Sequence, residues 1–179
     1  MNRNFLIPGL FVTLMTLSFH LMAEVTTITA NGFTSTNTVS VDADADTVYS
    51  AFKQVDKWWN PDHGYTGDAK NFYFEERLGG CFCERFPDGG AVEHLRIIYF
   101  APGKEIRFEG ALGPLQGLPT SGRMIWTIAP TEPGNDGPGS TITFTFHVFG
   151  FMEGGFEGLA PAVNGVVNEQ LQRLAELLN

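Results

Sequence analysis

Apolar and polar residues alternate through much of the chain with the period of two that is typical of β-strands. In the clearest run, residues 140–151, one face would carry Ile142, Phe144, Phe146 and Val148. Comparable runs occupy residues 33–43, 72–86, 91–100, 105–112 and 122–130. Turn signals separate them, and the strongest hairpin signal is "PDGG" at residues 87–90. The pattern predicts a largely antiparallel sheet.

Two segments repeat their apolar residues at helical spacing instead. Residues 44–55 begin with Asp44, a residue type that caps helix N-termini. Residues 159–178 carry one apolar stripe, formed by Val163, Val167, Leu171, Leu174 and Leu178. The order is a strand, short helices, a series of strands and a long final helix. Since the stripe and one face of the sheet must both be buried, the sequence predicts an α+β domain.

The N-terminus has the pattern of a secretory signal peptide. Arg3 supplies a positive charge, an apolar run follows, and Ala23 is a small residue before the first acid. An uncleaved membrane anchor is the alternative, but Pro8 and the polar residues after it make the run a poor permanent span. We predict a signal peptide at residues 1–23 and a single domain at residues 24–179. The mature chain would be periplasmic or secreted, without stable membrane insertion.

Charge and aromatic content narrow the choice of partner. Twenty acidic and 11 basic residues give a formal net charge of −9, so we expect neither nucleic acid nor an anionic lipid surface as partner. Sixteen Phe and three Trp are an unusual aromatic load for a small domain. Because an ordinary core needs fewer, the load suggests a cavity with aromatic walls. We predict no cofactor, and the sequence does not indicate an oligomeric state.

Five stretches carry a family resemblance: "VSVDADADTVYSAF", "KWW", "GGCFCERFPDGG", "TITFTF" and "GVVNEQLQRLAELL". From Thr36 to Leu178 the chain resembles the helix-grip superfamily, or SRPBCC, which includes START lipid carriers, birch-pollen-allergen-like proteins, polyketide cyclase-dehydratases and Hsp90-ATPase-activator-like domains. The resemblance implies a curved antiparallel sheet wrapped around the C-terminal helix, with short helices after the first strand. It also implies a cavity between sheet and helix, which carries sterols, lipids, hormones or polyketides in many members and serves catalysis in a minority.

The hairpin around "PDGG" holds the candidate chemistry. If the turn centres on residues 88–89, Glu84 faces Glu93 among apolar neighbours and Cys83 faces His94. A register shift of one residue would instead pair Glu84 with His94. Two carboxyl groups buried together cannot both ionise cheaply, so one would have a raised pKa and could exchange a proton near neutral pH. A cyclase or dehydratase needs such chemistry.

A structural role for these acids is the alternative that we favour. Arg107 or Arg123 on a neighbouring strand would pair with one of them. The ion pair would then orient a ligand or fix the sheet, without proton transfer.

Cys81 and Cys83 stand one residue apart on the same predicted strand. Their side chains would point the same way but lie roughly 6 to 7 Å apart, too far for a disulfide unless a bulge intervenes. A metal site is conceivable if both thiols converge with His94. His63 or Asp62 would then supply the fourth ligand, but nothing fixes that choice. We therefore predict no metal and expect thiols packed as small apolar groups.

The sequence thus predicts an exported protein that binds a small, largely apolar ligand of lipid, polyketide or aromatic type. The predicted ligand-binding residues are Trp59, Phe82, Glu84, Phe86, Trp126, Phe144 and Phe146. Two Gly- and Pro-rich loops, at residues 111–122 and 150–161, are expected to close over the ligand. The alternative is a cyclase- or dehydratase-type enzyme in which Glu84 and Glu93 are the catalytic acid and base. A protein-interaction module ranks last because of the predicted export signal.

Overall fold

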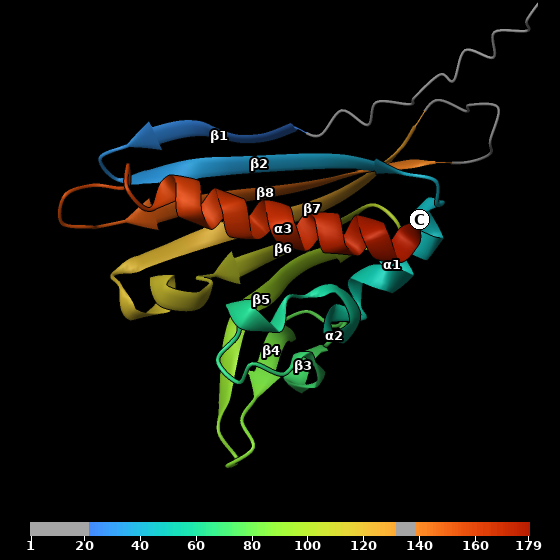
Figure 1. Ribbon diagram of the computed structural model, residues 1–179, viewed down its shortest axis with the longest axis horizontal. Coiled ribbons are helices and arrows are strands. Elements are labelled where there is room, and N and C mark those ends of the chain that lie inside the picture. The colour runs from blue at the N-terminus through green and yellow to red at the C-terminus, as the bar shows by residue number, and fades with distance from the viewer. Residues whose placement is uncertain (1–21, 132–138) are drawn as a thin grey trace, which may run out of the picture.

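The computed structural model describes residues 22–131 and 139–179. In these residues eight strands form one antiparallel sheet in the order β1-β2-β8-β7-β6-β5-β4-β3 (Figure 1). The strands are β1 (Met22–Thr29), β2 (Gly32–Val41), β3 (Phe72–Phe74), β4 (Cys81–Arg85), β5 (Ala91–Ala101), β6 (Glu105–Gly110), β7 (Thr120–Pro130) and β8 (Ser140–Gly150). The helices are α1 (Ala45–Phe52), α2 (Val55–Trp58) and α3 (Ala160–Leu178), with 3-10 turns η1 (Pro61–His63), η2 (Ala69–Asn71) and η3 (Gly113–Gly117). The predicted α+β, helix-grip architecture is confirmed.

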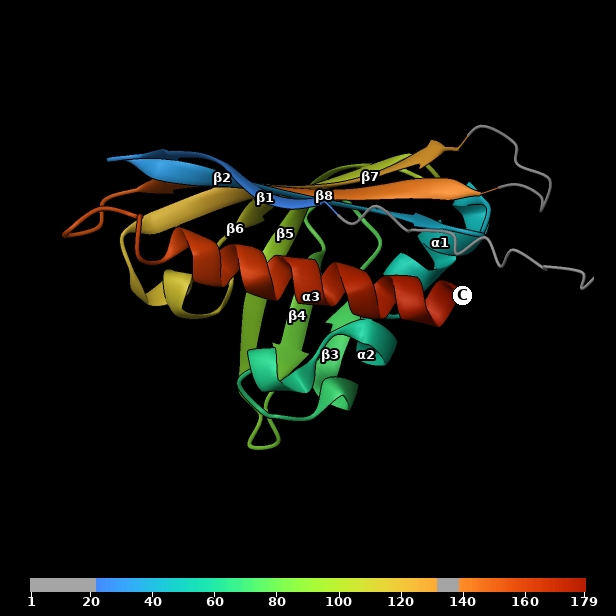
Figure 2. The same cartoon turned by 45° about the horizontal axis from the view of Figure 1, so that its top comes forward.

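The long helix α3 lies across the concave face of the sheet. Figure 2 shows β1, β2, β7 and β8 above the helix, while β3, β4 and β5 curve down beside it. Val167, Leu171 and Leu174 of α3 are buried, as the apolar stripe predicts. The short helices α1 and α2 lie near the C-terminal half of α3 (Figures 1 and 2). The sheet and these helices together enclose the stripe.

The first helix begins where the sequence predicts. The Asp44 carboxylate accepts a hydrogen bond from the backbone N–H of Thr47, with 2.8 Å between nitrogen and oxygen. This bond satisfies a donor that has no partner within the first helical turn. Val48 and Phe52 of α1 are fully buried. They fix α1 against the core beside the sheet.

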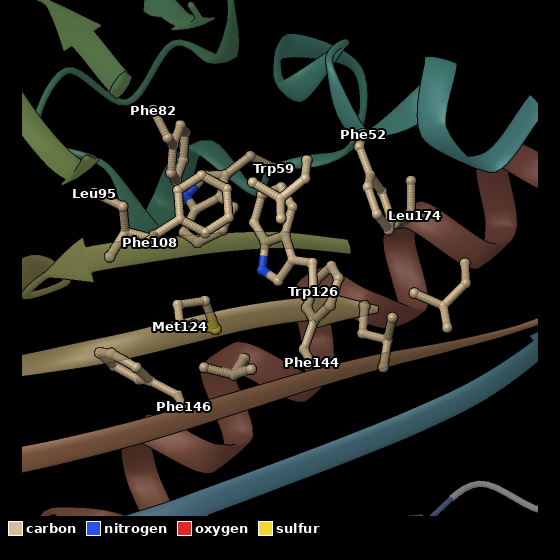
Figure 3. Packing of buried hydrophobic residues seen from close by; sticks show 14 of the residues in the cluster. Phe52, Trp59, Phe82, Leu95, Phe108, Met124, Trp126, Phe144, Phe146 and Leu174 are labelled. Carbon is tan, nitrogen blue, oxygen red and sulfur yellow. The ribbon is translucent and has the colours of Figure 1, made fainter. Parts of the chain in front are cut away.

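Aromatic rings fill the space between the helices and the central strands (Figure 3). Trp126 of β7 and Phe144 of β8 stack with ring centroids 4.8 Å apart, and Phe52 meets Trp126 edge-on at 5.3 Å. None of the three is more than 1% exposed. Much of the aromatic load therefore serves close packing in the core.

Two features of the sheet differ from the sequence pattern. Residues 72–86, predicted as one strand, fold back into β3 and β4, which pair antiparallel with Phe74 opposite Phe82. The pattern does not predict β1, whose residues after Val25 are exposed at the edge of the sheet. Of the predicted signal peptide, residues 1–21 lie outside the described residues. Within the described ranges, no helix has both the length and the apolar character needed to cross a bilayer.

Phe144 provides a test of this core. Phe144→Ala should lower the free energy of unfolding by about 3–5 kcal/mol, because it removes a fully enclosed ring and leaves a cavity. Phe149→Ala is the matched control on the same strand, since Phe149 is 46% exposed, and it should cost about 0.5 kcal/mol or less. Urea unfolding followed by fluorescence measures both. Equal losses in the two variants would contradict the packing described here.

Candidate functional site

A cavity of about 410 Å³ lies under the N-terminal half of α3. Its walls come from the segment of residues 59–65, from the start of η3, from α3 itself and from one residue of β5. The lining residues are Trp59, Asp62, His63, Gly64, Tyr65, His94, Leu112, Gly113, Pro114, Leu115, Leu159, Ala162, Val163, Val166 and Val167. Both loops that the sequence predicts to close over a pocket contribute, through residues 112–115 and Leu159.

Hydrogen bonds to α3 hold the segment of residues 59–65 in place. The Glu169 carboxylate accepts a hydrogen bond from the side-chain amide of Asn60, and its Oε2 atom lies 2.9 Å from His63 Nε2. Gln170 Oε1 accepts the backbone N–H of Asn60 at 2.7 Å. The hydrogen bond with His63, followed by that with Asn60, lowers the pKa of the Glu169 carboxyl. These hydrogen bonds thus connect two walls of the cavity, the segment of residues 59–65 and α3.

A β-bulge brings His94 into the cavity wall. Phe82 pairs with Leu95, but the next pair is Cys83 with Glu93, which leaves His94 as an extra residue in β5. His94 and Leu95 are consequently both buried, although they are neighbours in one strand, whereas Glu93 is exposed. The predicted facing of Cys83 with His94 is therefore wrong.

Cys81 and Cys83 form a disulfide, contrary to the prediction of two packed thiols. Their Cα atoms are 5.4 Å apart, whereas two residues of a regular strand span about 6.6 Å. β4 is therefore contracted at the point where β5 carries its extra residue. The sequence allowed a disulfide between these residues only if a bulge intervened, and a bulge is present. Because side chains alternate along a strand, the disulfide lies on the face opposite to Phe82 and Glu84.

The arrangement considered for a metal site does not form. Cys81 and Cys83 are bonded to each other, and His94 is directed to the inner face through the bulge. In the part of the chain that the structure describes, no three potential metal ligands gather.

Glu84 is the hydrogen-bond partner of His94. The Glu84 Oε2 and His94 Nε2 atoms are 3.1 Å apart, and the exposed fractions of the two side chains are 0% and 1%. The carboxylate also accepts backbone N–H groups, that of Tyr65 at 3.0 and 3.1 Å and that of Thr66 at 2.7 Å. A buried carboxylate is thus bonded on one side to β5 and on the other to the loop after η1.

Gly64 permits the loop to approach the carboxylate. A Cβ atom at this position would lie 2.5 Å from the Phe72 ring and 3.1 Å from Glu84 Oε1. Any side chain would therefore push the amides of Tyr65 and Thr66 away from their acceptor.

These hydrogen bonds decide the ionisation of the pair. Burial tends to raise the pKa of Glu84, but the hydrogen bonds from Thr66, Tyr65 and His94 outweigh it and hold that pKa below its usual value. Burial lowers the pKa of His94, and Glu84 opposes the shift only in part. At neutral pH the pair is therefore a carboxylate beside a neutral imidazole. Since a carboxylate can only accept, His94 Nε2 carries the ring proton.

Three aromatic rings fix the plane of the His94 ring. The ring centroids of Phe82, Phe72 and Tyr65 lie 5.1, 5.5 and 6.0 Å from it, with interplanar angles of 32°, 25° and 28°. Phe82 and Phe72 are themselves buried. The orientation of the imidazole is therefore determined both by its hydrogen bond and by packing.

Glu93 does not join Glu84 in the interior. Its carboxylate is exposed and forms a two-bond ion pair with Arg96, at 2.7 and 3.1 Å. The predicted pair of buried acids is therefore wrong, because the bulge turns Glu93 outward. The predicted arginine partners are wrong as well: Arg107 pairs with Glu105, and Arg123 pairs with Glu109 at 3.4 Å.

Most of the predicted aromatic walls lie elsewhere. Of the predicted ligand-binding residues, Trp59 lines the cavity and Glu84 supports His94 from behind. Four are buried in the core and absent from the lining: Phe82, Trp126, Phe144 and Phe146. Phe86 borders a shallow surface depression instead. The sequence reasoning missed the aliphatic wall of α3, although Val163 and Val167 belong to the stripe that it identified.

The comparisons with known proteins agree with the fold. No protein-family model and no curated protein matches this sequence. A conserved protein of unknown function from Enterococcus faecalis has a similar structure, with 11% identity and a TM-score of 0.58 over 89% of this chain and 77% of that one. The Mll3558 protein from Rhizobium loti is similar at 20% identity and a TM-score of 0.53, over 88% and 98% of the two chains.

A third similar structure is the di-domain aromatase/cyclase StfQ from the steffimycin biosynthetic pathway. It has 17% identity and a TM-score of 0.51 over 83% of this chain and 51% of that one. The three likenesses support the helix-grip fold.

The buried histidine predicts a particular loss of stability in acid. Because the pKa of His94 lies below its ordinary value of 6.5 in the folded chain, the unfolded chain binds a proton first as pH falls through that value. The free energy of unfolding should therefore fall more steeply between about pH 7 and pH 5 in the wild type than in His94→Gln, by at most about 1.4 kcal/mol per pH unit. His147→Gln, at an exposed position of β8, is the control and should follow the wild type. Parallel curves for all three proteins in urea titrations would contradict a neutral, buried His94.

Proposed function

We propose that this chain binds a small, largely apolar molecule in the cavity under α3, with His94 at the polar end of the site. The observation that carries the proposal is the cavity itself, whose volume of about 410 Å³ falls within the range typical of ligand sites. Its helix wall is aliphatic, with Ala162, Val163 and Val166 among the lining residues. Burial of apolar ligand surface there would supply affinity at about 25 cal/mol per Å².

The polar groups of the cavity would set the orientation of the ligand. Asp62, His63 and His94 border it, and His63 is already engaged by Glu169. His94 is the most enclosed of the three and has a fixed ring plane. A ligand that is apolar over most of its surface and carries a polar group fits this lining.

Export to the periplasm or the cell exterior belongs to the same proposal. The signal-like N-terminus supports it, with its charged residue, its apolar run and the small residue Ala23. The disulfide between Cys81 and Cys83 supports it independently, because disulfides persist mainly in oxidising compartments. An acidic chain with a net charge of −9 gives no support to a nucleic-acid partner.

Binding is favoured over the cyclase or dehydratase with two cavity acids. That enzyme would need both Glu84 and Glu93 within reach of one substrate. Glu93 is on the outside and paired with Arg96, and Glu84 lies behind the imidazole of His94. A lipid, polyketide or aromatic ligand remains the class that the cavity suits.

A cavity-filling variant tests the proposal. The neutral, apolar dye N-phenyl-1-naphthylamine should bind the mature protein with a rise in fluorescence and a dissociation constant in the micromolar range. Ala162→Trp should weaken binding at least ~10-fold, because the indole would occupy the cavity from α3. Leu177→Trp adds the same ring at an exposed position near the other end of α3 and should bind the dye as the wild type does. Equal binding by all three proteins, or none by the wild type, would refute the cavity as a ligand site.

A further inference from the structure

We propose that Glu84 and His94 form a general base that removes a proton from the molecule held in the cavity. This inference rests on the proposed function and adds a reaction and a substrate class to it. The substrate class is an otherwise apolar carbon acid, such as an unsaturated ketone, whose C–H group lies next to a carbonyl. His94 would be the catalytic residue and Glu84 its positioning residue.

The hydrogen bond to Glu84 determines which ring nitrogen can act. The carboxylate engages Nε2 at 3.1 Å and, being ionised, requires the proton to lie there. Nδ1 is then the unprotonated nitrogen. Among residues 22–131 and 139–179 it forms no hydrogen bond, and the imidazole borders the cavity. The Nδ1 lone pair is thus unoccupied, and in the proposed reaction this lone pair faces the ligand.

The surroundings suit a base rather than a mere hydrogen-bond acceptor. An imidazole that takes a proton in an apolar site creates a cation, and the cost falls if an anion is already in place. Glu84 is that anion. Its side chain is 0% exposed, and the backbone amides of Tyr65 and Thr66 donate hydrogen bonds to its carboxylate. The same loop, which begins in the cavity wall, therefore also fixes the charge that stabilises the imidazolium.

Four other titratable side chains lie near His94 or share its cavity. Glu84 meets it from β4 and Tyr65 from the loop, while Asp62 and His63 share its cavity. His63 is the competing base. Its Nε2 is paired with Glu169, but its side chain is 31% exposed and that of Glu169 is 40% exposed. Water can therefore screen that pair, whereas it has little access to Glu84 and His94.

The proposed step is a proton transfer without another reactant. Nδ1 takes the proton from the carbon next to the carbonyl group, the C–H electron pair forms the C=C bond of an enolate, and the carbonyl π pair moves to oxygen. Return of the proton to a different carbon of an unsaturated ketone shifts its double bond and restores the neutral imidazole. Glu84 remains ionised throughout.

The probe 5-nitrobenzisoxazole tests the base directly. Removal of its single ring C–H proton forms a nitrile, breaks the N–O bond and releases a coloured cyanonitrophenolate, so no oxidant or co-reactant is needed. The wild type should accelerate this reaction with saturation, and Ala162→Trp should suppress it. His94→Gln should lower kcat/KM at least ~100-fold, as expected for loss of a general base. His147→Gln should leave the rate unchanged.

Glu84→Gln separates positioning from simple support of the fold. The amides of Tyr65 and Thr66 would hold the carbonyl oxygen of the introduced side chain, so its NH₂ group would face His94 Nε2 and move the ring proton to Nδ1. The rate should then fall at least ~10-fold while dye binding is retained. The wild-type rate should rise with pH through an inflection below 6.5, and this inflection should move to lower pH in the variant, because Glu84 no longer stabilises the imidazolium.

Nitrogen NMR of His94 provides a readout that does not need turnover. The wild type should show the proton on Nε2, and Glu84→Gln should show it on Nδ1. A proton on Nδ1 in the wild type would overturn the proposal. It would also be overturned if His63→Gln, rather than His94→Gln, abolished the reaction. Dye binding without any His94-dependent rate would reject the base but leave the ligand site intact, whereas loss of both would reject the proposed function as well.

Discussion

The carboxylate of Glu84 is buried without exposed surface, and the site depends on how its charge is satisfied. An ionised group in such a place is tolerated only when hydrogen bonds replace the water that it has lost. The loop after η1 supplies two backbone amides, and β5 supplies His94. Hydrogen bonds to this one carboxylate therefore connect β4, the neighbouring strand β5 and a loop that has little regular structure of its own. Through Gly64 and Tyr65 the same loop reaches the cavity.

The sequence predicted the architecture because that architecture follows from repeating patterns. Alternation identified β8, and helical spacing identified α3 with its stripe at Val167, Leu171 and Leu174. Such signals extend over many residues, so an error at one position does little harm. The fold-back between β3 and β4 was missed because the residues on both sides continue the strand pattern.

The site was harder to predict because it depends on single exceptions to those patterns. His94 is one added residue: without it, Val92, Glu93, Leu95 and Arg96 would alternate regularly between the two faces. The adjacent burial of His94 and Leu95 cannot be read from alternation, which assigns neighbours to opposite sides. The disulfide escaped prediction for a related reason, since it requires the local contraction of β4 that accompanies the bulge. The aromatic content misled as well, because the rings fill the core and aliphatic residues of α3 face the cavity.

The bulge has a consequence for how such a site can arise or disappear. The chemistry at this position is set by the number of residues in β5 as much as by their identity. Removal of His94 would leave a regular ladder, with Leu95 and Val92 on the inner face and Glu93 and Arg96 outside. A single codon thus separates a strand whose buried histidine is hydrogen-bonded to Glu84 from one that presents only Leu95 and Val92 there. Related chains with the same overall sheet could differ in chemistry through strand length alone.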